Sequence, residues 1–409
     1  MTLPLSLDYS FCCDPTPDDE DNVDAALEYP DRVHSIKIQD PGAPLIKKVV
    51  TDMRKPFPSL VNLDLLCRSD PFRAIPKTFL GGSAPSLQHL SLSSIFPTHL
   101  PTLLLTARNL VTLALYHILP LNDYLPERLA RLLATLPRLT DFFTSCDVDM
   151  PLDQWQSPPE SPTRVILPAL TCLDYSGHCM YLEDFLAQVD MPRVYSIAIE
   201  YAMHQIQVSQ LSRFLERTQS FKIDYFTRVE VVFYHEDPYF VFDHPEGKSY
   251  LSMQMLDEAR APLEVQVRVM VHVLHQLAPI FFNVDVLYVR GFYVQRQSNQ
   301  MDITEWLPMF RLFPTIGVLR LSGGAGVNIA SALENTSEEM VTEVLPALRI
   351  IKLAKNELDN DEEVSEMDQD YWNESGALIE RFPFLRQFSG CPITVLSQEE
   401  EFVEAEWRQ

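Results

Sequence analysis

The sequence lacks the features that mark several large classes of protein. Its 409 residues contain no apolar run near the roughly 18 residues that a membrane helix needs. The amino terminus has no basic region ahead of an apolar stretch, so we expect no secretory signal peptide and no membrane partner. Seven cysteines without a CxxC pair favour a cytoplasmic or nuclear, not a secreted, protein. Glycine is scarce, at 12 residues, so phosphate-cradling loops are few.

The excess of negative charge is local. The net charge is −25, but three runs without a single base carry most of it: Asp14–Asp24, Glu357–Glu374 and Glu399–Glu406. Runs of this kind are typically solvated loops or tails, and the alternative is that they attract basic partners. Because lysine and arginine are not clustered, we expect no nucleic-acid partner.

What the chain does contain is an internal repeat. A proline or its substitute precedes an apolar residue, two variable residues and an apolar-x-apolar triplet. The spacing of successive copies is close to, or slightly above, the roughly 20–29 residues of leucine-rich repeats. The clearest copies open at Leu60, Leu87, Leu110, Leu170, Val194, Ile316 and Leu348, and weaker copies open at Val33, Leu139, Val284 and Leu385.

This repeat predicts an α/β fold. The apolar-x-apolar triplet has the period of a strand, and segments such as Leu129–Leu136 and Leu182–Leu186 have the period of a helix. Strands that alternate with helices at short range are expected to be parallel. We therefore predict one leucine-rich-repeat-like solenoid over residues 1–397: a curved horseshoe with strands on its concave face and helices on its convex face. An inserted hairpin is expected within about 218–262, an acidic loop at 357–374 and an acidic tail at 398–409.

Motifs that could carry chemistry are weak. Ser322–Asn328 follows a predicted strand but is an incomplete GxGxxG, which favours a simple turn. His272 and His275 share a helical face without a third metal ligand, and a structural pair is the better interpretation. No sequence motif pairs a nucleophilic side chain with a general base. We therefore expect no enzyme, no cofactor and no metal site.

The repeats resemble those of fungal F-box proteins with a degenerate leucine-rich-repeat region. The resemblance covers about residues 3–397 and is carried by four motifs: Phe79–Leu87, Val165–Thr171, Tyr181–Arg193 and Val341–Leu348. In that family an F-box docks on the Skp-type adaptor of cullin–RING ubiquitin ligases, and the repeats select substrates. The resemblance thus implies a non-catalytic, protein-binding scaffold for substrate recognition.

The F-box itself is not found in this chain. Leu125–Leu133 is similar to an F-box opening, but the next strand start, Leu139, leaves no room for the remaining helices. We interpret the segment as a repeat helix, and expect the Skp-type adaptor as a partner only if an F-box lies upstream. An adaptor-independent scaffold or decoy stays open as the alternative.

The variable residues beside each buried leucine should point to the open, concave side of the strands. Their charges predict a surface that is acidic in the early and middle repeats and basic in the late ones. Three aromatic residues among them resemble the anchors enriched at binding hot spots. The candidate partner-binding residues are Asn62, Asp64, His89, Tyr116, Asp141, Phe143, Asp174, Glu200, Tyr288, Arg290, Arg320 and Lys352.

Overall fold

A computed structural model of the chain describes most of the repeats. The described residues are 4–10, 17–39, 43–67, 76–95, 100–118, 125–146, 164–202, 206–221, 226–233, 237–243, 249–256, 261–281, 283–291, 303–322, 325–326, 328–329, 333, 343–354 and 393–396. The chain forms two compact units. Unit 1 comprises residues 1–199 and 218–220, and unit 2 comprises residues 200–217 and 221–409.

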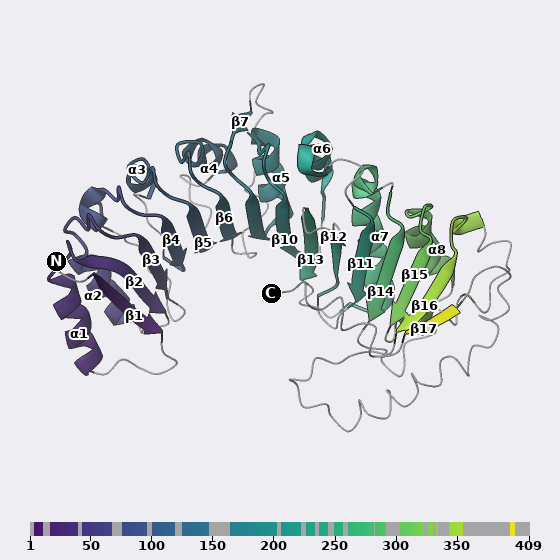
Figure 1. Cartoon of the computed structure of the whole chain (residues 1–409), viewed down its shortest axis with the longest axis horizontal. Helices are drawn as coiled ribbons and strands as arrows, with labels where there is room; N and C mark the ends of the chain where they lie inside the picture. The colour runs from purple at the N-terminus through teal and green to yellow at the C-terminus, as the bar shows by residue number, and fades with distance from the viewer. Residues whose placement is uncertain are drawn as a thin grey trace. The chain divides into compact units, whose positions relative to one another are not determined.

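Unit 1 contains a sheet whose strands pair in the order of the chain, with helices between them (Figure 1). Its helical segments are α1 (Pro17–Leu27), α2 (Ala43–Asp52), η1 (Phe79–Gly82), α3 (Leu100–Leu104), α4 (Pro126–Leu133) and α5 (Cys179–Gln188). A separate two-stranded sheet pairs β7 (Val165–Ile166) with β9 (Val189–Asp190). The main sheet runs β1 (Leu5–Ser10), β2 (Val33–Gln39), β3 (Asn62–Leu66), β4 (His89–Ser93), β5 (Thr112–Ile118), β6 (Asp141–Cys146), β8 (Cys172–Gly177) and β10 (Ser196–Ala202), whose last residues belong to unit 2.

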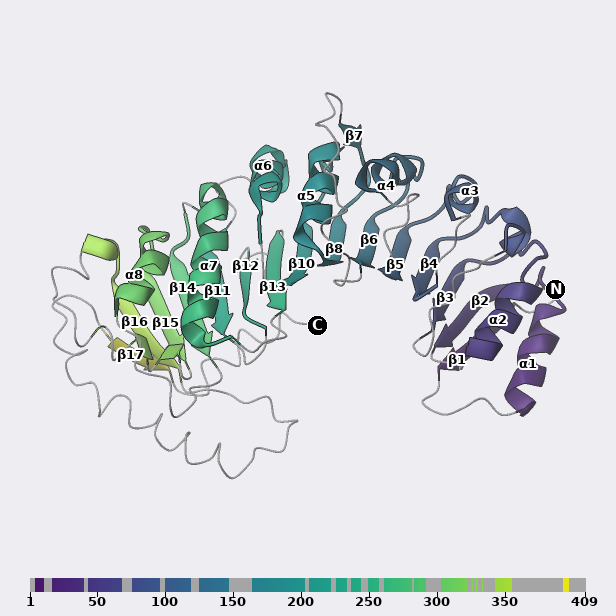
Figure 2. The same ribbon diagram turned by 180° about the vertical axis from the view of Figure 1, so that it is seen from behind.

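Unit 2 begins with an antiparallel section and continues with parallel strands (Figure 2). Its helical segments are α6 (Ser209–Arg217), α7 (Leu263–Leu277), η5 (Ala278–Ile280) and α8 (Ile303–Arg311), and η4 (Gln219–Phe221) ends in it. The sheet order is β13 (Tyr250–Leu256), β12 (Tyr239–Asp243), β11 (Arg228–Phe233), β14 (Val286–Gly291), β15 (Val318–Ser322), β16 (Ile350–Ala354) and β17 (Ile393–Leu396).

Most neighbouring strands are parallel, as the alternation of strand and helix predicts. The exception lies in residues 218–262, where β11 pairs antiparallel with β12, and β12 with β13. The expected hairpin is thus part of a three-stranded meander, and β11 returns to the parallel pattern by pairing with β14. The mixed α/β class and its mostly parallel sheet are confirmed.

The proline of the repeat occupies a turn ahead of the strand. Leu60 N–H donates to the Phe57 carbonyl across Pro58, and Ile316 N–H donates to the Phe313 carbonyl across Pro314. Proline at the second position of such a turn presets φ near −65°. The same bond spans the proline, or its substitute, ahead of Leu87, Leu110, Leu139, Val194, Val284 and Leu348.

A second backbone element ties each repeat to the next. The Val61 carbonyl accepts N–H groups from both Gln88 and His89, and the Gly317 carbonyl accepts from Arg349 and Ile350. These paired bonds fix the register between neighbouring strands, so a slip that would turn every side chain to the other face is prevented. Carbonyls with the same two bonds belong to Gln88, Val111, Thr140, Thr171, Thr227 and Asp285.

The helices cover one face of each sheet, and the repeated leucines fill the space between. In unit 1 the Phe142 ring of β6 lies 6.3 Å from that of Phe185 in α5. In unit 2 the Phe233 ring of β11 meets Trp306 of α8 edge-on at 5.7 Å. The residue that opens each turn is also buried, an anchor that the repeat pattern did not include. These turn residues are Phe57, Ala84, Ala107, Leu136, Leu167, Met191, Phe281, Phe313 and Leu345.

Three expectations from the sequence need comment. Residues 17–24 of the first acidic run lie in helix α1, not in a loop, and Asp24 pairs with Lys48 of α2 at 2.7 Å. The helical spacing of Val271, Leu274 and Ala278 predicts a buried stripe, but the buried residues of α7 include Val267, Met270 and Leu274, and Val271 is half-exposed. Finally, Pro126–Leu133 forms α4 behind the N-cap residue Leu125, and β6 follows it, so the segment is a helix between two strands. Residues 355–392, which include the second acidic run and Leu385, and residues 397–409 lie outside the described part.

Candidate functional site

The face of each sheet that the helices leave uncovered is defined by the core contacts. In β6 and β8, Phe142 and Tyr175 pack on α5, so Asp141, Phe143 and Asp174 point to the opposite side. In β11, Phe233 packs on α8, so Glu230 points away from that helix. We call this side the open face. It is where the sequence places the candidate binding residues.

Most of the candidate residues lie where the strand pattern predicts. In unit 1, His89 is exposed. The other candidate residues there are half-exposed: Asn62, Asp64, Tyr116, Asp141, Phe143 and Asp174. In unit 2, Glu200, Arg290 and Arg320 are half-exposed. Lys352 pairs in register with Arg320, which assigns its position to the same face.

Tyr288 is not exposed as the sequence predicts. It is only 8% exposed, although it occupies an open-face position. Its hydroxyl accepts a hydrogen bond from Ser322 Oγ at 3.2 Å, and the Arg290 guanidinium lies 5.5 Å from its ring centroid. Tyr288 is therefore part of the packing of unit 2. Its ring is largely covered and offers a partner little aromatic surface.

In unit 1 two rows of open-face residues run across the strands, and Tyr116 lies in a third, in register with Ser93. One row contains Asp8, Lys37, Asp64, Ser91, Ala114, Phe143 and Asp174 in register. The other contains Ser35, Asn62, His89, Thr112, Asp141 and Cys172. Lys37 stands directly between Asp8 and Asp64, and Gln39 donates to the Asp64 carboxylate at 2.8 Å. Opposite charges side by side stabilise this end of the sheet.

Further along the unit 1 face, acids raise the pKa of two neighbouring groups. Burial raises the pKa of the Tyr116 hydroxyl, and the carboxylates of Asp174 and Asp64 raise it further because they disfavour a tyrosinate. Burial also raises the pKa of the Cys172 thiol; Asp141 and Asp174 act in the same direction, and the hydrogen bond with Ser196 opposes them. Cys172 is thus held as a thiol, which makes it a poor nucleophile.

In unit 2 the open face centres on an ion pair. Arg290 Nη1 donates to Glu230 Oε1 at 3.1 Å, with 23% and 12% of the two side chains exposed. Glu230 pairs in register with Tyr288, and Arg290 with Ser322. The sequence did not identify Glu230, because β11 lies in the stretch that departs from the repeat. Its only signal was the alternation within Val229–Phe233.

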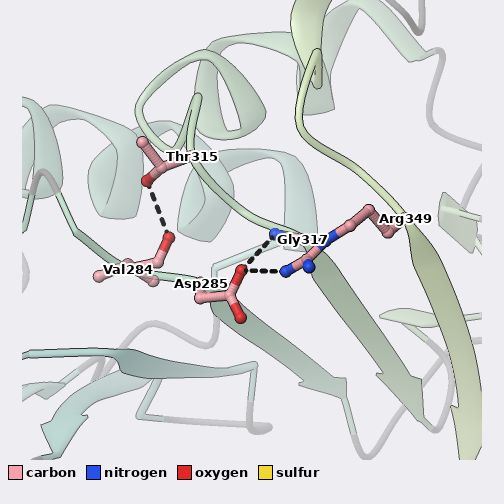
Figure 3. Close-up of polar contacts among 5 residues, drawn as sticks. All are labelled: Val284, Asp285, Thr315, Gly317 and Arg349. Atoms are coloured by element: carbon pink, nitrogen blue, oxygen red, sulfur yellow. Dashed lines mark hydrogen bonds and ion pairs between the residues drawn. The ribbon is translucent and has the colours of Figure 1, made fainter.

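A second polar group at the strand entries was also missed. Asp285 Oδ1 accepts hydrogen bonds from Gly317 N at 3.1 Å and from Arg349 Nη2 at 2.9 Å, and Thr315 Oγ1 donates to the Val284 carbonyl at 2.9 Å (Figure 3). A Cβ on Gly317 would lie 2.6 Å from Asp285 Oδ1 and 2.3 Å from Arg349 Nη2. The group links three successive repeats and is well explained as a structural clamp.

These surfaces present charged groups, hydrogen-bonding groups and aromatic rings. Among the described residues no group of three or more histidine, cysteine or acidic side chains could hold a metal ion. His272 contacts Gln276 on α7. No helix in the described ranges is long and apolar enough to cross a membrane.

No protein-family model matches the chain, and no similar curated protein is found.

Proposed function

We propose that the chain is a leucine-rich-repeat-like solenoid that binds another protein on its open face and carries out no catalysis. The observation that carries the proposal is the alternation of buried and half-exposed side chains along the strands. Alternate residues are buried in the core, and those between them present half-exposed acids, amides and aromatic rings. Paired backbone bonds between repeats hold these side chains on a rigid support. Pre-organisation of this kind reduces the entropy lost on binding.

In this proposal the repeats select a substrate, as in the F-box subunits that they resemble. The parallel strands would form the concave side of a horseshoe and the helices its convex side. Repeat proteins of this architecture use an extended concave surface to bind their partners. The partner is a protein, because a sheet face offers area and side-chain variety in place of the deep pocket that a small molecule needs.

A binding experiment with a matched control tests the proposal. A partner is first purified with the full chain and then titrated against it by isothermal calorimetry. Alanine at Asn62 and Thr112, on the open face of unit 1, should weaken binding. Alanine at Glu127 and Arg131, an exposed ion pair on α4, is the control and should leave the affinity unchanged. Loss of binding in the α4 variant alone would refute the proposal.

An adaptor-independent scaffold is the second candidate. It is favoured by α4, since the one segment that resembles an F-box opening leads directly into strand β6. Co-purification of the full chain with the Skp-type adaptor distinguishes the two candidates. Stoichiometric recovery of the adaptor supports a ligase subunit, and its absence beside a recovered substrate protein supports the independent scaffold.

A further inference from the structure

The β5–β8 part of the unit 1 open face combines an aromatic ring with acids from neighbouring strands. Phe143 of β6 stands in register between Ala114 of β5 and Asp174 of β8. Asp141, two residues before Phe143, is in register with Cys172. Diagonal neighbours such as Asp141 and Asp174 are roughly 7–8 Å apart at Cα, within reach of one side chain placed between them. We call Tyr116, Asp141, Phe143 and Asp174 the Phe143 patch.

The Phe143 patch lies on strands that supply acids but no lysine or arginine. At the other end of the unit, Lys37 lies between Asp8 and Asp64 and offsets part of their charge. In contrast, the sequences of β5, β6, β8 and β10 contain no lysine or arginine. Asp141 accepts one neutral hydrogen bond, from Thr140 Oγ1 at 2.7 Å, which leaves its charge in place.

The aromatic ring narrows the chemistry of a matching ligand. Phe143 is half-exposed, so part of its ring is accessible to a ligand, and its neighbour in the same row is the small residue Ala114. A guanidinium group stacks on an aromatic ring and pairs with carboxylates through its planar set of donors. An ammonium group satisfies the charges but does not match the planar geometry as well.

We propose that the Phe143 patch binds an arginine side chain of an extended segment of a partner protein. Charge complementarity identifies the occupant. The chain's own acidic runs at 357–374 and 399–406 have the wrong sign for this face. The guanidinium stacks on Phe143 and is held by Asp141 and Asp174, while Tyr116 borders the site. This inference rests on the proposed function and names the chemistry of the partner at the same open face.

Peptide binding to the full chain tests the inference. The probe is a fluorescent pool of nine-residue peptides with randomised polar flanks and a central arginine. The matched pool has citrulline, which has the same shape but no charge, at the central position. We expect the arginine pool to bind at least about tenfold more tightly, since charge-assisted hydrogen bonds are the stronger ones. A pool with central lysine should lie between the two.

Variants of the chain then locate the binding. Asp141→Asn with Asp174→Asn keeps the side-chain shapes and should weaken the arginine pool about tenfold or more. Phe143→Leu should weaken it about two- to fivefold, the effect of an exposed cation–aromatic contact. The control, Asp31→Asn with Asp52→Asn, removes the same charge from exposed positions of unit 1 outside the strands and should change nothing. Circular dichroism verifies that each variant is folded.

The outcomes separate this inference from the proposed function. Equal binding of the arginine and citrulline pools, no binding of either, or preference for acidic peptides overturns the inference. So does self-association of the chain that Asp141→Asn abolishes, because a second copy is then the occupant. If a purified partner still loses affinity with the Asn62 and Thr112 changes, the proposed function stands although the arginine assignment fails.

Discussion

The ion pair between Arg290 and Glu230 makes a sharp prediction about stability. Its two side chains are 23% and 12% exposed, so removal of the guanidinium leaves a carboxylate that water reaches poorly. Breaking a fully buried pair costs about 3–5 kcal/mol. Because both groups here retain some exposure, we expect Arg290→Met to lower the free energy of unfolding by about 2–3 kcal/mol.

A double-mutant cycle measures this effect. Urea denaturation followed by circular dichroism gives the free energies of the natural chain, Arg290→Met, Glu230→Gln and the double variant. The double variant should recover at least about 1 kcal/mol relative to Arg290→Met, since the unpaired charge is gone. A loss below about 0.5 kcal/mol for Arg290→Met, together with no coupling, would refute the reasoning.

Three further changes probe other parts of the molecule. Phe313→Ala should cost about 3–5 kcal/mol in urea denaturation, because the ring is fully buried 5.0 Å from that of Phe281, and Phe313→Leu should cost less. His178→Ala should cost about 1 kcal/mol, since His178 Nδ1 caps α5 by accepting from Met180 N, whereas His178→Asn should retain most of the stability. The raised pKa of Tyr116 stabilises the folded state below its ordinary value of 10.0, and this contribution is lost as the pH rises from there through the folded pKa. Tyr116→Phe should therefore flatten the fall in stability above pH 10, measured by denaturation at successive pH values; an unchanged slope would contradict the assignment.

Strand positions could be predicted because one period decides them. Leu90 and Leu92 alternate along β4, and both are fully buried, as is Leu87 ahead of the strand. The same alternation, read from the sequence, assigns Asp141 and Asp174 to the open face. A two-residue period leaves only two choices of face, and burial of leucine selects one of them.

Other features depend on contacts that a short repeat does not encode. The buried residue at the start of each turn varies from Ala84 to Phe313, so its common role appears only from the turn geometry. Tyr288 has the sequence position of an exposed residue, but Ser322 and Arg290 from neighbouring strand positions cover it. Glu230 comes from the antiparallel section, where the spacing of the repeat no longer applies.

The first acidic run shows a different limit. Its composition suggests a solvated loop, yet residues 17–27 form α1. A proline opens this helix and acids follow it, which are both favoured in the first turn of a helix. Val23 and Leu27, which lie one turn apart, are buried. Two apolar residues at this spacing were the signal that the charge obscured.

Carboxylate footprinting of the full chain with and without a purified protein partner tests the central claim, binding at the open face, most directly. The reagent modifies exposed acids, and mass spectrometry gives the modification rate at each. We expect Asp64, Asp141 and Asp174 to be protected several-fold by the partner, with no change at Glu127 of α4 or at Asp31. Protection of Glu127 with unchanged rates at the three open-face acids would contradict the claim.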